Sequence, residues 1–110
     1  MKKFLMSAFV LLTGFAFGQS NNIKVIGNNQ TKTLECNQNM VFITGSKNVL
    51  TIKGSCKEIK VIGSHNKISA SKVDGVYING DGNSLSYIGT STPNQKLKSE
   101  LIGRDNSVTQ

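Results

Sequence analysis

The sequence predicts an all-β fold: a small, single-domain parallel β-solenoid of about four coils with a period of 17–18 residues. A motif recurs in which two alternating apolar residues precede a glycine, two polar residues, an asparagine and two more alternating apolar residues. The motif begins at Val41, Ile59 and Val76, and a looser repeat begins at Leu101. The glycines at positions 27, 45, 63 and 80 are 18, 18 and 17 residues apart. Nearly constant repeats of this kind are typical of a coil that stacks on itself.

Alternating apolar residues on either side of each glycine predict two strands per repeat, with one side-chain set on the inner face. A meander of hairpins would favour Asn-Gly turns, and Asn79-Gly80 is the only such dipeptide. In a solenoid, each strand instead pairs in parallel with its equivalent one coil away. The expected inner columns are Val41/Ile59/Val76, Ile43/Val61/Ile78 and Leu50/Ile68/Leu85.

The asparagine of each repeat falls in the inward phase at a corner. Stacked amides there can hydrogen-bond to one another and to free backbone groups. We therefore predict a structural corner ladder made of Asn48, Asn66, Asn83 and Asn106.

Both ends depart from the repeat, as capping coils do. In the first repeat, Gln30 and Lys32 stand where an asparagine and an apolar residue are expected. Near the other end, an insertion over residues 90–98 lengthens the period to 23 and contains the only proline, Pro93. This insertion is predicted to be a loop that interrupts strand pairing.

The N-terminus has the features of a secretory signal peptide, which we place at residues 1–18. Lys2 and Lys3 precede a mostly apolar stretch, and Ala16-Phe17-Gly18 is a small-x-small cleavage site. The apolar stretch is shorter than the roughly 20 residues that span a bilayer. Residues 19–110 are then an exported, periplasmic or secreted β-solenoid domain without a transmembrane segment.

Export determines how the two cysteines are interpreted, because thiol pairs are oxidised outside the cytoplasm. Cys36 lies nine residues after Gly27, and Cys56 lies eleven residues after Gly45. These are nearly equivalent places on adjacent coils, whose Cα atoms would be about 5 Å apart. We predict a structural disulfide between Cys36 and Cys56.

The chain is basic, with a formal net charge of +7 that falls to +5 without Lys2 and Lys3. Its lysines are dispersed, and the domain has only three aromatic residues: Phe42, Tyr77 and Tyr87. We therefore expect no sequence-specific nucleic-acid partner. Weak attraction to an anionic partner stays open, whether an envelope polysaccharide, a lipid headgroup or extracellular DNA.

No catalytic, cofactor or metal site is expected. The six acidic residues stand singly rather than in a pair suited to polysaccharide hydrolysis. Asp81-Gly82-Asn83 fits a tight turn better than a calcium loop, and His65 occupies a variable corner position. Positions 44, 62 and 79 are Thr, Ile and Asn, so no threonine ladder of the ice-binding type forms there.

The repeated Gly-Ser-x-Asn motif, with Cys36 before its first full repeat and Cys56 after it, resembles a family of small exported bacterial proteins. That family is known as domain of unknown function 3060, and the resemblance extends roughly from Asn22 to Gln110. It implies a secreted or envelope-associated β-solenoid and brings no catalytic residues. The last repeat departs from the family pattern at Ser99 and at Arg104-Asp105.

Together these features predict a non-enzymatic structural or binding module of the bacterial cell envelope. The alternative is a self-assembling subunit, because Gly-x-x-Asn repeats also resemble those of curli-type subunits. Lys32, Arg104 and Asp105 are charges of the kind that block edge-to-edge pairing, although end-to-end association stays open.

Overall fold

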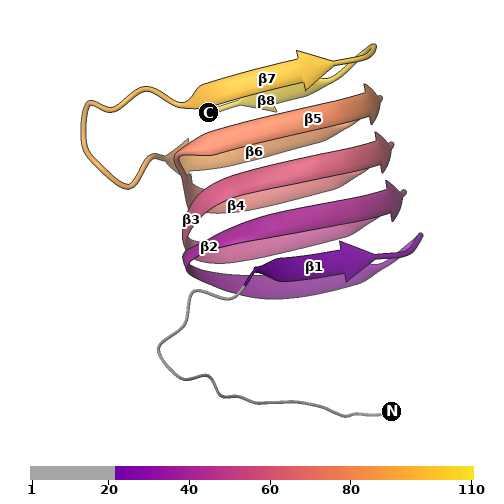
Figure 1. The fold of residues 1–110 in the computed structure, drawn as a ribbon, viewed down its shortest axis with the longest axis horizontal. Coiled ribbons are helices and arrows are strands. Elements are labelled where there is room, and N and C mark those ends of the chain that lie inside the picture. The colour runs from indigo at the N-terminus through magenta and orange to yellow at the C-terminus, as the bar shows by residue number, and fades with distance from the viewer. Residues whose placement is uncertain (1–21) are drawn as a thin grey trace, which may run out of the picture.

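Parallel strands wind into stacked coils in the computed structural model, which describes residues 22–110 (Figure 1). The predicted signal peptide, residues 1–18, lies outside the described residues. All seven strand pairings in the described part are parallel, which confirms the predicted β-solenoid. The strands are β1 (Ile23–Ile26), β2 (Thr31–Ser46), β3 (Val49–Ser64), β4 (Lys67–Val73), β5 (Gly75–Asp81), β6 (Ser84–Gly89), β7 (Lys98–Ile102) and β8 (Ser107–Thr109).

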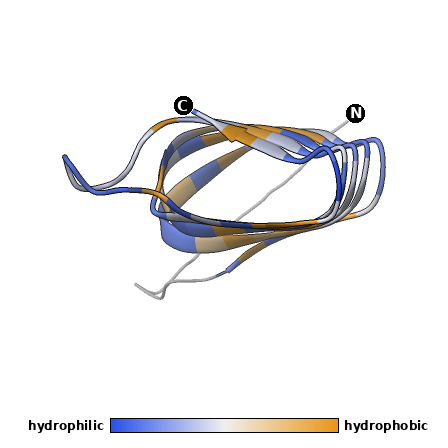
Figure 2. Ribbon diagram, turned by 90° about the horizontal axis from the view of Figure 1, so that it is seen from above, coloured by the Kyte–Doolittle hydropathy of each residue, from blue (hydrophilic) through white to orange (hydrophobic). Residues whose placement is uncertain are grey.

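The coils are flattened, so the strands form two opposed sheet faces (Figure 2). One face consists of β1, the second halves of β2 and β3, then β5 and β7. The other face consists of the first halves of β2 and β3, then β4, β6 and β8. The Cα extents are 35 × 31 × 18 Å. No helix within residues 22–110 is long and apolar enough to cross a membrane.

The core lies between the two faces and consists of the predicted apolar columns. Val41 pairs with Ile59, which pairs with Val76, and the other two columns are in the same register. All nine predicted column members are buried. The alternation in the sequence therefore indicates the inner face correctly, because in-register parallel strands stack equivalent side chains.

The two corners of a coil differ in sharpness. Each Gly-x-x-Asn corner ends a strand, whereas β2 and β3 continue around the opposite corner as strands of 16 residues. Pairing between β2 and β3 persists there, with a register shift around Asn39. The second corner of these coils is thus a gentle bend within a strand.

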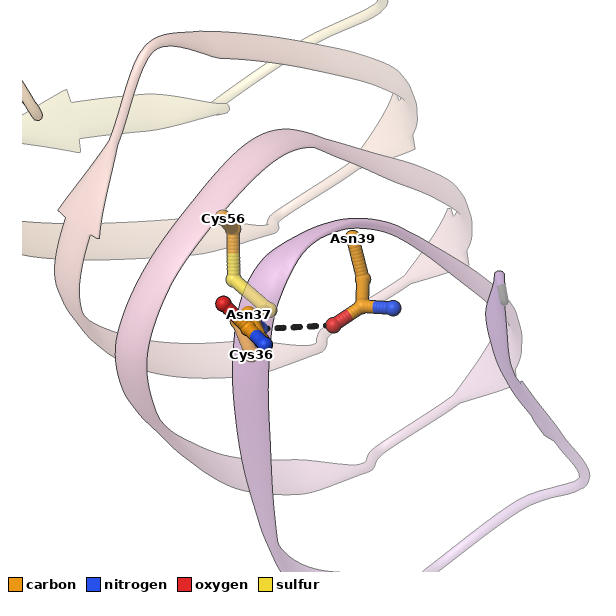
Figure 3. The surroundings of a disulfide bond; sticks show 4 residues. All are labelled: Cys36, Asn37, Asn39 and Cys56. Carbon is orange, nitrogen blue, oxygen red and sulfur yellow. Dashed lines mark hydrogen bonds between the residues drawn. A yellow bond between two sulfur atoms is a disulfide. The ribbon is translucent and has the colours of Figure 1, made fainter. Parts of the chain in front are cut away.

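The predicted disulfide joins the first two coils at this gentle bend (Figure 3). Cys36 and Cys56 are bonded, with their Cα atoms 5.1 Å apart. Both cysteines are buried. Beside them, the Asn37 backbone N–H donates a hydrogen bond to Asn39 Oδ1.

The insertion forms the predicted loop, which projects from the side of the stack between β6 and β7 (Figure 1). It is shorter by one residue than predicted, because Lys98 already belongs to β7 and its N–H donates to Asp74 O at 3.1 Å. Asp74 also anchors the start of the loop. Its Oδ1 accepts from the Ser91 N–H at 2.8 Å, and both of its carboxylate oxygens accept from the Ser91 hydroxyl.

Candidate functional site

The asparagine side chains form a continuous ladder at the sharp corners. Asn48 Nδ2 donates to Asn66 Oδ1 at 3.0 Å, and Asn66 Nδ2 donates to Asn83 Oδ1 at 3.0 Å. Asn83 Nδ2 in turn donates to Asn106 Oδ1 at 3.1 Å. Each amide also donates to the carbonyl oxygen of a corner glycine on the preceding coil. The side-chain amides thus hydrogen-bond to one another and to the backbone. The ladder therefore stabilises the corner and is not a ligand site.

The corner glycines stack at the shortest approach between coils. Gly63 has φ of +140°, and a Cβ built on it would overlap the carbonyl oxygen of Gly45. Only glycine fits this column, because an L side chain is both strained at such a φ and blocked by the backbone of the coil below. The backbones of successive coils are therefore in direct contact at this corner, and no molecule fits between them.

The outward residues of the β1–β2–β3–β5–β7 face are the strongest candidate for a binding site. One column on this face alternates lysines with aromatic residues and ends in a carboxylate. We call it the lysine–aromatic column: Lys24, Phe42, Lys60, Tyr77 and Glu100. Lys60 Nζ lies 5.9 Å from the centroid of the Phe42 ring and 5.6 Å from that of Tyr77. The ammonium group is thus held between two rings, at distances suited to cation–π attraction.

Two hollows flank this column, and each has one of its aromatic rings as a wall. The hollow at the N-terminal side has a volume of about 440 Å³ and is lined by Phe42 with Lys24 and Ile26. The other has a volume of about 460 Å³ and is lined by Tyr77 with two lysines and three carboxylates: Lys57, Lys98, Glu58, Asp74 and Glu100. An aromatic wall and a lysine ammonium therefore occur together in both hollows.

Gly75 leaves space for the second hollow, which it lines between Glu58 and Lys98. A Cβ built on Gly75 would meet its nearest atom, Glu58 Cγ, at 3.5 Å, which is ordinary contact. Neither backbone conformation nor packing thus requires glycine here. The missing side chain enlarges the hollow beside Tyr77.

The opposite face carries a second regular column, made of hydroxyl residues. Thr33, Thr51, Ser69, Ser86 and Thr109 follow one another in register, and all five are exposed. We call this the hydroxyl column. The sequence prediction missed it, because it considered only the outward position before the glycine. The signal is present in the sequence: each member lies three residues after a corner amide.

The remaining sequence candidates have structural roles or lie apart. Asp81 Oδ1 accepts from the Arg104 N–H at 3.0 Å, and Asn83 is buried in the ladder, so this segment forms a turn. His65 is exposed at a corner with φ of +59°. Within residues 22–110, no group of three or more His, Cys, Asp or Glu side chains is placed to hold a metal ion.

Comparison with known proteins identifies a family but no activity. Residues 43–96 match the family model described as "Protein of unknown function (DUF3060)". No curated protein and no solved structure is significantly similar to the chain. The matched segment contains Cys56 and the strands β3 and β5, which carry Lys60 and Tyr77; Cys36 and Phe42 lie before it. The chain thus contains a DUF3060 domain, a domain of unknown function, over residues 43–96.

Proposed function

We propose that this chain is a non-enzymatic, exported module that binds an anionic polysaccharide of the bacterial cell envelope through the lysine–aromatic column. The observation that carries the proposal is the Lys60 ammonium, held between the Phe42 and Tyr77 rings on one exposed sheet face. The disulfide between Cys36 and Cys56 is typical of an oxidising environment outside the cytoplasm. The periplasm or the cell exterior is the setting proposed here.

The chemistry of the column suits a sugar polymer with acidic groups. Aromatic side chains present large apolar faces, on which the apolar face of a sugar ring can pack. Phe42 and Tyr77 are two coils apart, which corresponds to about 10 Å along the stack. The Lys60 ammonium between them is then placed to pair with a carboxylate, sulfate or phosphate on the polymer.

The overall charge supports the same class of ligand. Without Lys2 and Lys3, 11 of the 13 lysine and arginine residues remain, against 6 acidic residues. Such an excess attracts polyanions over distances comparable to the Debye length, which is about 8 Å at physiological salt. Binding is accordingly expected to weaken as salt is added.

The test compares lysine variants on opposite faces. Lys60→Gln and Lys67→Gln each remove one positive charge from an outward strand position, but only Lys60 lies in the column. We would measure the affinity of the mature protein for polygalacturonate by titration calorimetry at low salt, with dextran as a neutral reference. This affinity is expected to fall about tenfold in Lys60→Gln, which corresponds to about 1.4 kcal/mol. Lys67→Gln is expected to lose less than half of that. Equal losses would reduce the effect to general charge attraction and refute a site at the column.

A second pair of variants tests the aromatic contribution. Phe42→Ala/Tyr77→Ala is expected to abolish measurable binding, whereas Thr51→Ala/Ser69→Ala in the hydroxyl column keeps it. If the hydroxyl variant loses binding and the aromatic variant does not, the ligand occupies the other face and the proposal is wrong.

A self-assembling subunit of the curli type is the second candidate, and the amide ladder favours it because stacked asparagines also occur in cross-β fibrils. Fibres that bind thioflavin and grow with protein concentration would support this candidate. Breakdown of a polysaccharide from a test panel would instead indicate an enzyme.

A further inference from the structure

We propose that the C-terminal coil of one molecule stacks on the N-terminal coil of a second molecule of this chain, which continues the solenoid head to tail. This inference goes beyond ligand binding and rests on the two ends of the stack. Within residues 22–110, β1 and β8 terminate the sheet path, and β7 pairs only with β5. Strand edges of this kind are ready to pair with another chain.

One apolar column indicates what covers the C-terminal end. In another, which ends in Val108, the exposed Lys32 of the second molecule would come next. Val25, Ile43, Val61, Ile78 and Leu101 form one inward column in register. The first four are at most 1% exposed, whereas Leu101 is 42% exposed despite its inward position. A second molecule in the same register places its first coil over Leu101, with its Val25, which is already buried in its own molecule, next in the column. Burial of Leu101 then contributes the apolar part of the contact.

The amide ladder has complementary groups at its two ends. Each rung donates its backbone N–H to the side-chain oxygen of the next coil, beginning with Gln30 N to Asn48 Oδ1 at 3.0 Å and continuing to Asn106. Within the described residues, no rung follows Asn106. At the other end, Gln30 Oε1 is buried and has no hydrogen-bond partner within residues 22–110. Stacking in register brings the Asn106 N–H of one molecule to Gln30 Oε1 of the next.

The outward columns also match across the junction. The lysine–aromatic column begins with Lys24 and ends with Glu100, so continuation places opposite charges side by side. The hydroxyl column begins with Thr33 and ends with Thr109, so Thr109 of one molecule would lie beside Thr33 of the next. Gly103 of one molecule would likewise lie beside Gly27 of the next, in the column that admits only glycine. Because the two contacting surfaces differ, the contact is heterologous and generates an open-ended series of oligomers.

Cross-linking tests the register directly. In the mature protein carrying Thr33→Cys and Thr109→Cys, the predicted junction brings the two new cysteines to neighbouring strands. Their Cα separation of about 5 Å is suited to a disulfide. Mild oxidation is expected to give a ladder of oligomers on non-reducing electrophoresis. The control, Thr51→Cys with Thr109→Cys, also has two exposed cysteines, but Thr51 lies one coil inside the stack. A ladder of equal strength from the control indicates random collision and overturns the proposal.

Charge exchange gives an independent measurement that needs no new cysteine. Sedimentation velocity of the unmodified mature protein is expected to show mass that increases with concentration. Lys24→Glu and Glu100→Lys each place like charges at the junction and are expected to weaken association severalfold. An equimolar mixture of the two variants restores opposite charges at both kinds of junction and is expected to restore association. A monomer at all concentrations, or a mixture no better than either variant alone, overturns the proposal.

Discussion

Asn48 and Asn66, on consecutive coils, share a two-pronged contact in which both the backbone N–H and the side-chain Nδ2 of Asn48 donate to the single Oδ1 of Asn66. The two distances are 3.1 and 3.0 Å. Both side chains are at most 1% exposed, so water cannot replace these bonds. The side-chain oxygen of Asn66 thus binds both the backbone and the side chain of the preceding coil.

Replacement of Asn66 by alanine is therefore expected to destabilise the fold strongly. It leaves the Asn48 N–H and one of the two Nδ2 hydrogens of Asn48 without an acceptor, and Gly45 O without its side-chain donor. Since a buried unsatisfied polar group costs about 1–3 kcal/mol, we expect a loss of about 3–5 kcal/mol in the free energy of unfolding. Urea denaturation followed by circular dichroism measures it. Asn79→Ala, at an exposed outward position, is the control and is expected to change stability by less than about 0.5 kcal/mol.

The glycine column leads to a second prediction about stability. Gly63→Ala introduces a Cβ that overlaps Gly45 O at a φ of +140°, so adjacent coils have to separate. We expect a loss of at least about 3 kcal/mol or a failure to fold. Gly75→Ala, which meets only ordinary contacts, is expected to stay within about 1 kcal/mol of the parent protein. Similar unfolding midpoints for the two variants would contradict the close approach at the corner.

These two predictions concern features that the sequence already indicated. The buried residues repeat because each coil must present the same apolar residues to the coil above and below it. Glycine and asparagine recur for a similar reason, because each coil needs the same backbone conformation and the same hydrogen bonds at this corner. A period of 17–18 residues, read from four glycines, was therefore sufficient to predict the fold, the inner columns and the disulfide register.

The candidate binding face was much harder to predict from the sequence. The residue type changes from coil to coil along the lysine–aromatic column, since an outward side chain is not required to match its neighbour. Phe42, Lys60 and Tyr77 come together only through the register of β2, β3 and β5. Both outward columns nevertheless lie at a constant offset from the corner. The lysine–aromatic column lies three residues before each corner glycine, and the hydroxyl column lies three residues after each corner amide, so a systematic comparison of all outward positions would have found both.

The loop of residues 90–97 is expected to depend on a single carboxylate. Asp74→Ala removes the acceptor of the Ser91 N–H and hydroxyl, and so releases the start of the loop from β4 and β5. Limited trypsin digestion is expected to cleave after Lys96 several times faster, because proteases act on locally released segments. Glu35→Ala, which removes an exposed carboxylate elsewhere, is expected to leave the cleavage rate unchanged. Unchanged cleavage in Asp74→Ala as well would show that other contacts hold the loop.

The disulfide is expected to stabilise the first two coils against unfolding, because it closes a loop across a sequence separation of 20 residues. In the chain-entropy model, such a loop contributes about 3 kcal/mol. Cys36→Ser/Cys56→Ser is therefore expected to lower the free energy of unfolding by about that amount while the circular dichroism spectrum of the folded state is retained. Reductant is expected to lower the melting temperature of the parent protein and to leave that of the double variant unchanged. Equal melting of the parent with and without reductant would refute a stabilising role, since the two buried cysteines would then contribute through packing alone.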